Sequence, residues 1–320
     1  MRRSDFIRFS KKLTLFFVLP FCVWVYLELK VKQTPDSYLI KREAIERLAP
    51  NLELLVLGNS HAYYGIKPSV FSVPSYSLAN VNQTVDLDVD LMLKYVDQLP
   101  KLKYVVQSLS LFSLGFRMSE HAEEWRQYFY TYYFGVTGQP GFKNYFHPKS
   151  WSLTLALGRD LTWSRIQESE GWMGFVKGLD DHGWYGRPGV DADMLNTAIS
   201  LPKVRREQES INPRDQWDDA KRRLTLMASR LKEHGVQLII TISPAYPTYF
   251  KAFDPELVRS FYAAVEQLCK ETSAKCVNYN GDKRLVAGDF FDLHHLNQGG
   301  ADKYSRILDQ EVIQKLTATR

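Results

Sequence analysis

The chain has 320 residues, of which 45% are hydrophobic, and a formal net charge of +5. This length allows one large or two ordinary domains with a substantial core. The positive charge is modest and spread out, without a basic stripe carrying interleaved aromatic residues, so nucleic acid is not expected as a partner. The three cysteines fit no zinc-binding spacing.

Residues 1–32 differ in composition from the rest of the chain. Residues 1–12 carry five basic side chains and one acidic side chain, whereas the next run, Leu13 to Leu27, has no charge. This run of 15 residues is at the short end for a membrane span, and Pro20 lies in its middle. We expect an uncleaved signal-anchor. A cleaved signal peptide is the main alternative, although no small-residue cleavage site follows, and a buried helix of a soluble protein is the third.

The charges of this segment also predict its orientation. Because basic residues remain on the cytoplasmic side of a membrane, we expect a cytoplasmic amino terminus and an extracytoplasmic chain from about residue 33 onward. The protein would then be a single-pass protein of the inner membrane with a periplasmic domain. In an oxidising compartment Cys269 and Cys276, seven positions apart, could form a disulfide, and two buried free thiols are the alternative.

Helical and strand patterns alternate along most of the remaining chain. Helices are predicted over residues 36–48, 85–98, 216–233, 255–269 and 299–316, and strands over 54–57, 103–107, 236–242 and 276–279, with a further strand and loop within 76–84. This alternation is typical of a doubly wound parallel sheet, so the expected fold class is α/β.

An insertion, residues 113–213, interrupts the alternation. From Phe112 to Tyr185 there are 18 aromatic residues. Most simply they form the core of an inserted helical subdomain; a glycan-binding cleft and a lipid or protein contact are the alternatives. The expected organisation is a cytoplasmic tail and anchor (1–32), a first part of the α/β domain (33–112), the aromatic-rich insertion (113–213) and a second part of the α/β domain (214–320).

A candidate nucleophile follows the first predicted strand. Leu54 to Leu57 is a short apolar run typical of a buried parallel strand, and Gly58 and Asn59 end it. Both residue types tolerate positive φ, so the chain can turn sharply and present Ser60 at the carboxyl end of the strand, where open α/β sheets bind ligands. The alternative is that Ser60 is only a helix N-cap.

A serine nucleophile needs a base that is itself oriented by a carboxylate. Asp292 and His295 are three residues apart, a spacing that brings a carboxylate beside an imidazole. We therefore expect Ser60, His295 and Asp292 to be catalytic, with His294 as the less favoured base. Asp292, His294 and His295 could instead bind a metal, but no second ligand cluster accompanies them, so neither a metal nor a cofactor is predicted.

These segments resemble the conserved blocks of the SGNH (GDSL-like) hydrolase superfamily. Its first block, a strand followed by G-D-S, is similar to Gly58-Asn59-Ser60, and its last block, D-x-x-H, is similar to Asp292 to His295. Asn59 replaces the usual aspartate. The resemblance implies a flavodoxin-like, three-layer doubly wound sheet that carries a large helical insertion here.

The resemblance also implies an oxyanion hole. Its expected donors are the backbone N–H groups of Ser60 and Asn82, with the side-chain amide of Gln83 or Asn80 as a candidate third donor. The chain differs from the superfamily pattern at this oxyanion hole. Ser108 to Leu111 occupies the position of the superfamily's G-x-N-D block, so the asparagine donor of that block is missing.

Within the superfamily, the chain resembles membrane-anchored bacterial members that act on cell-envelope polysaccharides. The resemblance implies an O-acetyl esterase or O-acetyltransferase acting on an acylated exported polysaccharide, with a multi-spanning membrane O-acyltransferase as a partner. His61, Asn80 and Tyr246 are expected to line the substrate site. The alternative is a catalytically inactive protein of the same fold that binds glycan or scaffolds an export complex.

Overall fold

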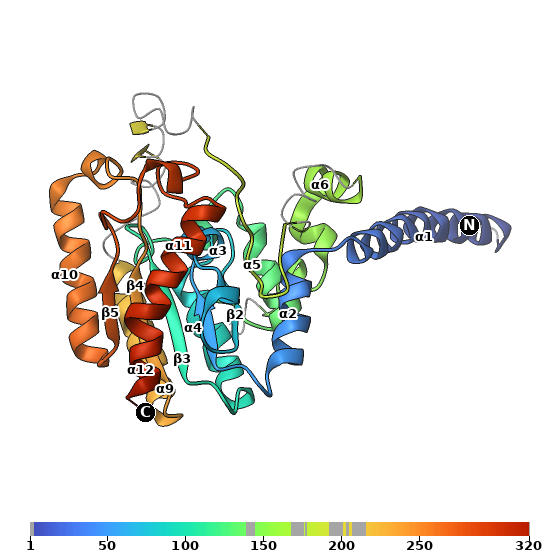
Figure 1. The fold of residues 1–320 in the computed structure, drawn as a ribbon. Coiled ribbons are helices and arrows are strands. Elements are labelled where there is room, and N and C mark those ends of the chain that lie inside the picture. The colour runs from blue at the N-terminus through green and yellow to red at the C-terminus, as the bar shows by residue number, and fades with distance from the viewer. Residues whose placement is uncertain are drawn as a thin grey trace.

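The computed structural model describes residues 3–138, 145–167, 176, 178–191, 201–202, 205–206 and 216–319. The remaining parts of the predicted insertion lie outside the described residues. Figure 1 shows a layered α/β body from which one long amino-terminal helix projects.

A five-stranded sheet forms the centre of the body. Its strands are β1 (Leu54–Leu57), β2 (Ser75–Ser77), β3 (Tyr104–Leu109), β4 (Gln237–Ile242) and β5 (Lys275–Asn278). Every pairing is parallel, and the strand order is β2-β1-β3-β4-β5. The α/β fold with a parallel sheet is therefore confirmed. Because the order reverses between β1 and β3, their carboxyl ends form the crevice where doubly wound sheets bind ligands.

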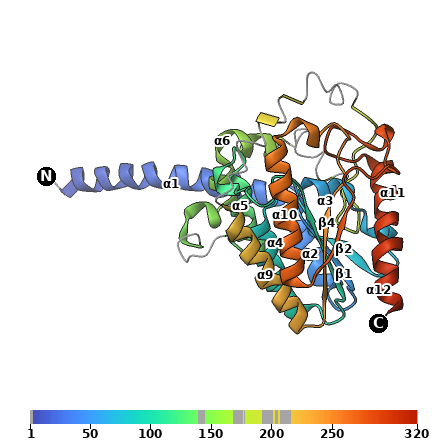
Figure 2. The same ribbon diagram turned by 90° about the vertical axis from the view of Figure 1, so that its left-hand side faces the viewer.

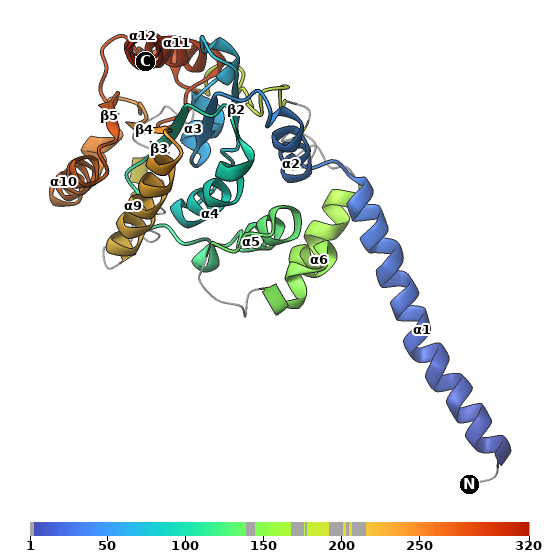
Figure 3. The same cartoon turned by 90° about the horizontal axis from the view of Figure 1, so that it is seen from below.

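Helices cover both faces of the sheet. One face packs against α2 (Ser37–Leu48), α4 (Val85–Tyr95), α9 (Trp217–Glu233) and α10 (Pro255–Thr272), and the other against α3 (Ser60–Gly65), α11 (Gln298–Leu308) and α12 (Gln314–Ala318). Side chains of β1 alternate between the two cores, with Leu55 on the first face and Val56 on the second. The view from below shows these layers on either side of the strands (Figure 3).

Most of the described aromatic rings of the insertion are structural. Its helices are α5 (Trp125–Phe129), a π-helical turn (Tyr130–Phe134) and α6 (Leu153–Ile166). The following rings are buried: Trp125, Phe129, Tyr130, Tyr133, Phe134 and Trp184. The core interpretation is therefore correct for these rings, whereas four others are exposed: Tyr145, Phe146, Trp151 and Trp163.

Residues 178–191, here called the return segment, bring the insertion back onto the α/β body. The backbone N–H of Ser77 in β2 donates to the carbonyl of His182 at 2.9 Å, and the indole N–H of Trp184 donates to the carbonyl of Tyr64 in α3 at 2.9 Å. Gly183 has φ +74°, and a Cβ there would lie 2.3 Å from the Ser77 carbonyl oxygen. This close approach requires glycine.

Cys269 at the end of α10 and Cys276 in β5 form a disulfide with a Cα–Cα distance of 6.1 Å. The sequence left this pair open between a disulfide and two free thiols. The disulfide joins the carboxyl-terminal part of α10 to the start of β5, which is the edge strand of the sheet.

Helix α1 (Arg3–Gln33) extends away from the body (Figure 2). Among the described residues, one helix is long and apolar enough to cross a membrane, and it covers Ile7–Gln33. Its apolar side chains are almost all exposed, so α1 is not the core helix of a soluble protein. Near its carboxyl end Val31 is fully buried against the body, so the packed structure begins before residue 33.

Glu28 of α1 is buried against the amino terminus of α6. Its carboxylate accepts hydrogen bonds from the backbone N–H groups of Leu153 and Thr154, at 3.0 Å each, and from the hydroxyls of Ser152 and Thr154, at 2.8 Å each. A carboxylate in this position satisfies backbone donors that a helix leaves unpaired and opposes the positive end of the helix dipole. Glu28 therefore joins the long helix to the insertion.

Replacing Glu28 by alanine should destabilise the protein, because buried donors at the start of α6 lose their acceptor. The expected loss is about 1–3 kcal/mol in the free energy of unfolding, measured as a lower thermal unfolding midpoint of the full chain in detergent. Glu46→Ala is the matched control, since Glu46 forms an exposed i,i+4 pair with Arg42 and its removal should cost under about 0.5 kcal/mol. Equal effects of the two substitutions would contradict this role of Glu28.

Candidate active site

The turn after β1 presents Ser60 at the start of α3. Gly58 has φ +135°, and a Cβ at this position would lie 3.0 Å from the carbonyl oxygen of Ser108 on β3. Only glycine fits this conformation and spacing. Asn59 is the N-cap of α3, and its side-chain oxygen accepts from the backbone N–H of His61 at 3.0 Å. The sharp turn predicted from Gly58 and Asn59 is therefore present.

Ser60, His295 and Asp292 form one hydrogen-bonded chain. The Oγ of Ser60 lies 2.8 Å from Nε2 of His295, and Nδ1 of His295 lies 2.8 Å from Oδ2 of Asp292. The three residues are 4–8% exposed, so the chain is largely shielded from water. A serine acyl-transfer site requires this arrangement, in which a nucleophile contacts a base and the base contacts an orienting carboxylate.

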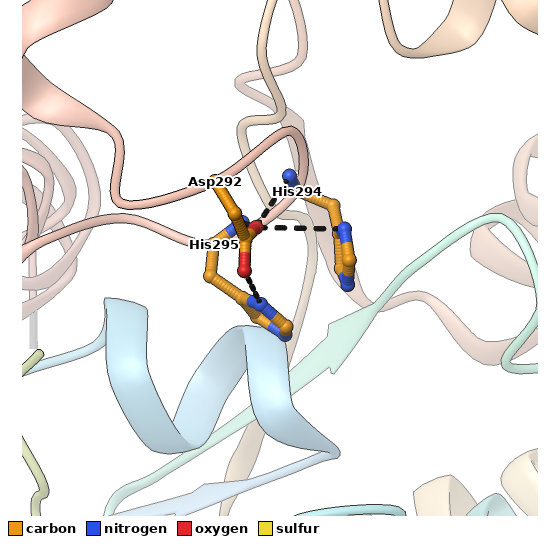
Figure 4. A group of neighbouring side chains, drawn as sticks. All are labelled: Asp292, His294 and His295. Carbon is orange, nitrogen blue, oxygen red and sulfur yellow. Dashed lines mark hydrogen bonds and ion pairs between the residues drawn. The ribbon is translucent and has the colours of Figure 1, made fainter. Parts of the chain in front are cut away.

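The carboxylate of Asp292 fixes the histidine. Besides contacting the His295 ring, it accepts from the backbone N–H groups of His294 at 2.9 Å and His295 at 2.8 Å (Figure 4). Burial raises the pKa of Asp292, but the attraction of the two histidines and these hydrogen bonds outweigh it, so the pKa lies well below its ordinary value. An ionised Asp292 places the proton of neutral His295 on Nδ1 and leaves Nε2 free to accept from Ser60.

His294 lies beside the base without replacing it. Its ring centroid is 3.9 Å from that of His295, and it stacks against Tyr249. Burial, together with the nearby His295, lowers the pKa of His294 to about 3, so the ring is neutral near pH 7. Its Nδ1 lies 3.5 Å from Oδ1 of Asp292, an ion-pair distance, and makes no hydrogen bond within the described part of the chain. The geometry thus favours His295 over His294 as the base.

The same side chains also satisfy the spacing of a metal site, since donor atoms of Asp292, His294 and His295 lie within 4.8 Å of one another. However, the carboxylate oxygen and His295 Nδ1 are 2.8 Å apart, which is the separation of a shared proton, and the other ring nitrogen contacts Ser60. A metal ion bound to Nδ1 of His295 would have to displace its hydrogen bond to Asp292. The arrangement therefore fits a triad better than a metal centre.

Backbone N–H groups are available where an oxyanion would form. Within the described residues, no acceptor contacts the N–H of Ser60 or of Asn82. The loop that carries Asn82 runs beside the nucleophile turn, because the N–H of Asn80 donates to the carbonyl of Gly58 at 3.2 Å. Asn82 has φ +57°, and its side chain donates to Glu123 of the insertion at 2.6 Å, which holds the loop in this conformation. That these two N–H groups bind an oxyanion stays a prediction.

The two side chains expected as a third oxyanion donor are held by other protein groups. The amide nitrogen of Gln83 donates to Asp88, and its oxygen accepts from the hydroxyl of Tyr130. The amide of Asn80 donates to Ser37 at 3.3 Å, and its oxygen accepts from the N–H of Val81 at 2.9 Å. Both side chains are buried, and each amide nitrogen and oxygen already has a protein partner. These contacts count against Gln83 as an oxyanion donor and against Asn80 as a substrate ligand, because either role would have to use the second hydrogen of an amide that is already held.

The end of β3 carries serines where an asparagine donor was sought. Ser108 shares a hydrogen bond with Ser243 at 2.7 Å, and the Ser110 hydroxyl accepts from the side-chain nitrogen of Asn59 at 2.9 Å. Asn59 donates to Ser113 as well, at 3.1 Å. Because Asn59 must both donate to these hydroxyls and accept from His61, an asparagine suits the position better than an aspartate.

The other predicted substrate residues lie against the catalytic loop. His61 is buried, and its ring packs against the rings of Phe112, His294 and His295 with centroid distances of 5.3–5.7 Å. Burial, reinforced by the two histidines, lowers the pKa of His61 well below its ordinary value, so this ring is neutral. The N–H of Tyr246 donates to the carbonyl of Leu293 at 3.0 Å. Both residues therefore support the loop, and partly exposed Tyr246 remains a candidate substrate contact.

Two residues near the triad were missed by the sequence analysis. The ring of Tyr64 meets the ring of His295 edge to face at 5.0 Å, and Arg187 of the return segment lies over the rings of Tyr64 and Phe291 at 4.4 and 4.6 Å. Tyr64 could have been found from its i+4 position after Ser60 on α3. Arg187 has no such signal, because its place depends on how the insertion folds back.

A buried carboxylate lies behind the nucleophile turn. Asp88 of α4 accepts from the N–H of Gly58 at 3.0 Å, and from the side-chain amides of Gln83 and of Gln107. Burial raises the pKa of Asp88 to about 7, although these hydrogen bonds act in the opposite direction. The turn at Gly58, the loop that carries Gln83 and strand β3 thus all donate hydrogen bonds to one titratable group, the carboxylate of Asp88.

No protein-family model matches the chain, and no curated protein matches it. The interpretation of the site therefore rests on its geometry and on the chemistry of its residues.

Substitution of the two adjacent histidines should have unequal effects. We expect His295→Gln to slow acylation of Ser60 by a fluorophosphonate probe about 10³-fold or more, because general-base catalysis is lost. His294→Gln should stay within about 10-fold of the parent, with an unchanged pH profile between pH 5 and 9, because His294 does not titrate in that range. Similar losses in both variants, together with loss of labelling on chelation, would indicate a metal site instead.

Asp88 should make stability depend on pH. The folded chain holds this proton up to about pH 7, whereas the unfolded chain releases it near pH 4, so stability conferred by the protonated group is lost as pH rises between these values. In Asp88→Asn this loss, on the order of 2–4 kcal/mol, should disappear, measured as the difference in unfolding free energy between pH 4.5 and 8. Gln107 can turn its amide to suit the variant, since its Oε1 has no partner in the described residues. An unchanged pH slope would contradict this assignment.

Proposed function

We propose that this chain is an extracytoplasmic serine acyl-transfer enzyme, an O-acetyl esterase or O-acetyltransferase acting on a cell-envelope or exported polysaccharide. The observation that carries the proposal is the hydrogen-bonded chain from Ser60 through His295 to Asp292, with 2.8 Å at each step. These three groups suit attack on an ester carbonyl. Near them lie the N–H groups of Ser60 and Asn82, which have no acceptor among the residues that the structure describes.

The reaction would proceed in two halves. His295 Nε2 removes the Ser60 hydroxyl proton as Oγ bonds to the ester carbonyl carbon, and the N–H groups of Ser60 and Asn82 stabilise the oxyanion. The tetrahedral intermediate collapses, the bond to the leaving oxygen breaks, and His295 returns the proton to that oxygen. In the second half, His295 removes a proton from water or a sugar hydroxyl as that oxygen bonds to the acyl carbon; the bond from this carbon to Ser60 Oγ then breaks, and His295 returns the proton to Oγ.

The finer fold assignment belongs to this proposal. The strand order, with the nucleophile after the first strand and the histidine after the last, supports a flavodoxin-like arrangement of SGNH type. The resemblance of the Gly58-Asn59-Ser60 and Asp292 to His295 blocks points to the same superfamily. At the end of β3 the hydroxyls of Ser108 and Ser110 are hydrogen-bonded to other side chains, so this segment leaves fewer oxyanion donors than the superfamily pattern implies.

Three features support an anchored, extracytoplasmic enzyme. Helix α1 has the length and composition of a membrane span. Burial of Glu28 and Val31 against the body favours retention of that helix over cleavage, since removal would leave donors of α6 unpaired. The Cys269 to Cys276 disulfide suits an oxidising compartment. With the basic residues of the amino terminus in the cytoplasm, the body would lie in the periplasm.

Esterase and transferase would use the same residues, and the acceptor of the second half-reaction distinguishes them. A transferase would receive its acyl group from a membrane donor, for which a multi-spanning O-acyltransferase is the expected partner. Incubating the full chain with p-nitrophenyl acetate and a deacetylated polysaccharide would measure the share of acetate passed to sugar. Release of acetate to water alone would indicate an esterase.

Removal of the nucleophile tests the proposal directly. In the full chain in detergent, a fluorophosphonate should label one serine, and Ser60→Ala should abolish labelling and lower turnover of p-nitrophenyl acetate by about 10⁶-fold. Ser69→Ala is the matched control, since Ser69 is exposed nearby and should leave both signals unchanged. A folded parent protein that is never labelled would overturn the enzyme proposal and favour the inactive glycan-binding or scaffold alternative.

A further inference from the structure

Exposed apolar side chains are concentrated in one place outside α1. Among the described residues, nine large hydrophobic side chains outside that helix are exposed, and six of them lie between residues 145 and 163. The six, here called the aromatic patch, are Tyr145, Phe146, Trp151, Leu155, Leu161 and Trp163. Scattered single residues of this kind are ordinary on a protein surface, but six within 19 consecutive positions point to an interaction surface.

The patch lies where α1 leaves the body. The amino terminus of α6 is bonded to Glu28, and at its other end fully buried Arg165 forms an ion pair with Asp36, just beyond α1, at 2.6 Å. Both ends of α6 approach the end of α1 because the helix bends at Gly158, which has φ +71°. Figures 2 and 3 show α6 beside the carboxyl end of α1.

The length of the apolar run in α1 brings this region to the membrane. Leu13 to Leu27 has 15 residues, which corresponds to roughly 22 Å of helix, whereas the hydrocarbon core of a bilayer is about 30 Å thick. A span this short draws its flanking residues toward the hydrocarbon. Glu28, which follows the run directly, is bonded to α6, so α6 must lie at the depth of the bilayer surface.

The composition of the patch matches the headgroup region. Tryptophan and tyrosine concentrate where apolar chains meet hydrated headgroups, because their rings are amphipathic. Charged side chains are interspersed with the patch, and Arg159 and Asp160 are more than four-fifths exposed at the bend of α6. Such charges are tolerated among headgroups but not in hydrocarbon, and they are depleted at the centre of protein interfaces.

We propose that the aromatic patch binds the lipid headgroup layer of the leaflet from which α1 emerges, so that the protein contacts the membrane at two places. This inference rests on the proposed membrane anchor but not on the proposed chemistry. Lipid contact at the patch, together with the fixed junction between Glu28 and α6, holds the body in one orientation relative to the bilayer.

Site-specific fluorescence in nanodiscs tests this proposal. In a Cys22→Ser background, the full chain would carry one NBD label at Trp151→Cys or Trp163→Cys, in discs of phosphatidylcholine and phosphatidylglycerol. Leu226→Cys is the matched control, since Leu226 is also an exposed apolar residue and belongs to α9, a helix that lies away from α1 in Figures 1 and 3. Phe17→Cys in α1 reports on the anchor itself.

Labels at 151 and 163 should be quenched several-fold more by lipids with a headgroup spin label than the label at 226, and several-fold less by aqueous iodide. If the label at 17 is quenched by deep spin-labelled lipids while those at 151 and 163 behave like 226, the patch proposal is overturned and the anchor stands. If the label at 17 is not quenched, both are overturned. Shielding from iodide in native membranes but not in nanodiscs would overturn the lipid proposal in favour of a protein partner.

Discussion

A hydrogen bond between residues 235 positions apart defines the candidate site: Ser60 Oγ meets His295 Nε2 at 2.8 Å. The parallel sheet makes this contact feasible, because the carboxyl ends of all its strands lie at one edge. A backbone hydrogen bond then holds the loop after β5 to Tyr246. Two further backbone hydrogen bonds, made by the N–H groups of Asp191 and Gln298, connect this part of the chain to the return segment. The serine is fixed by a helix start and the histidine by several separate segments, so loop contacts as well as the sheet determine their alignment.

Elements with strong local signals could be predicted from the sequence. The run from Leu54 to Leu57 is apolar on both faces because it is covered on both faces, and Gly58 ends it because only glycine fits against Ser108. The spacing of Asp292 and His295 was informative for the same reason: residues three apart are brought together by local backbone geometry alone. At these positions the structure is determined by residues close together in the chain, and the sequence pattern therefore predicted it correctly.

The rest depended on contacts that no local pattern encodes. Gln83 and Asn80 have the right side chains for an oxyanion hole, but buried partners from α4, the insertion and α2 engage them. The boundary expected at residue 32 follows the composition of the anchor, whereas the packing that continues through Glu28 depends on α6, more than 120 positions later. Buried polar groups must find partners, and which partners they find is a property of the whole fold.

The insertion connects the end of α1 to the loop that carries Asn82 and Gln83 through polar contacts. Asp36, directly after α1, accepts from Tyr133 and pairs with Arg165, and one turn earlier in the insertion Tyr130 donates to Gln83. Glu123 holds Asn82 and is itself held by Arg126. These groups are mostly buried, where breaking a pair leaves an uncompensated charge or donor, so the connection is stiff. An aromatic-rich segment that looks like a separate subdomain in the sequence therefore joins α1 rigidly to the candidate site.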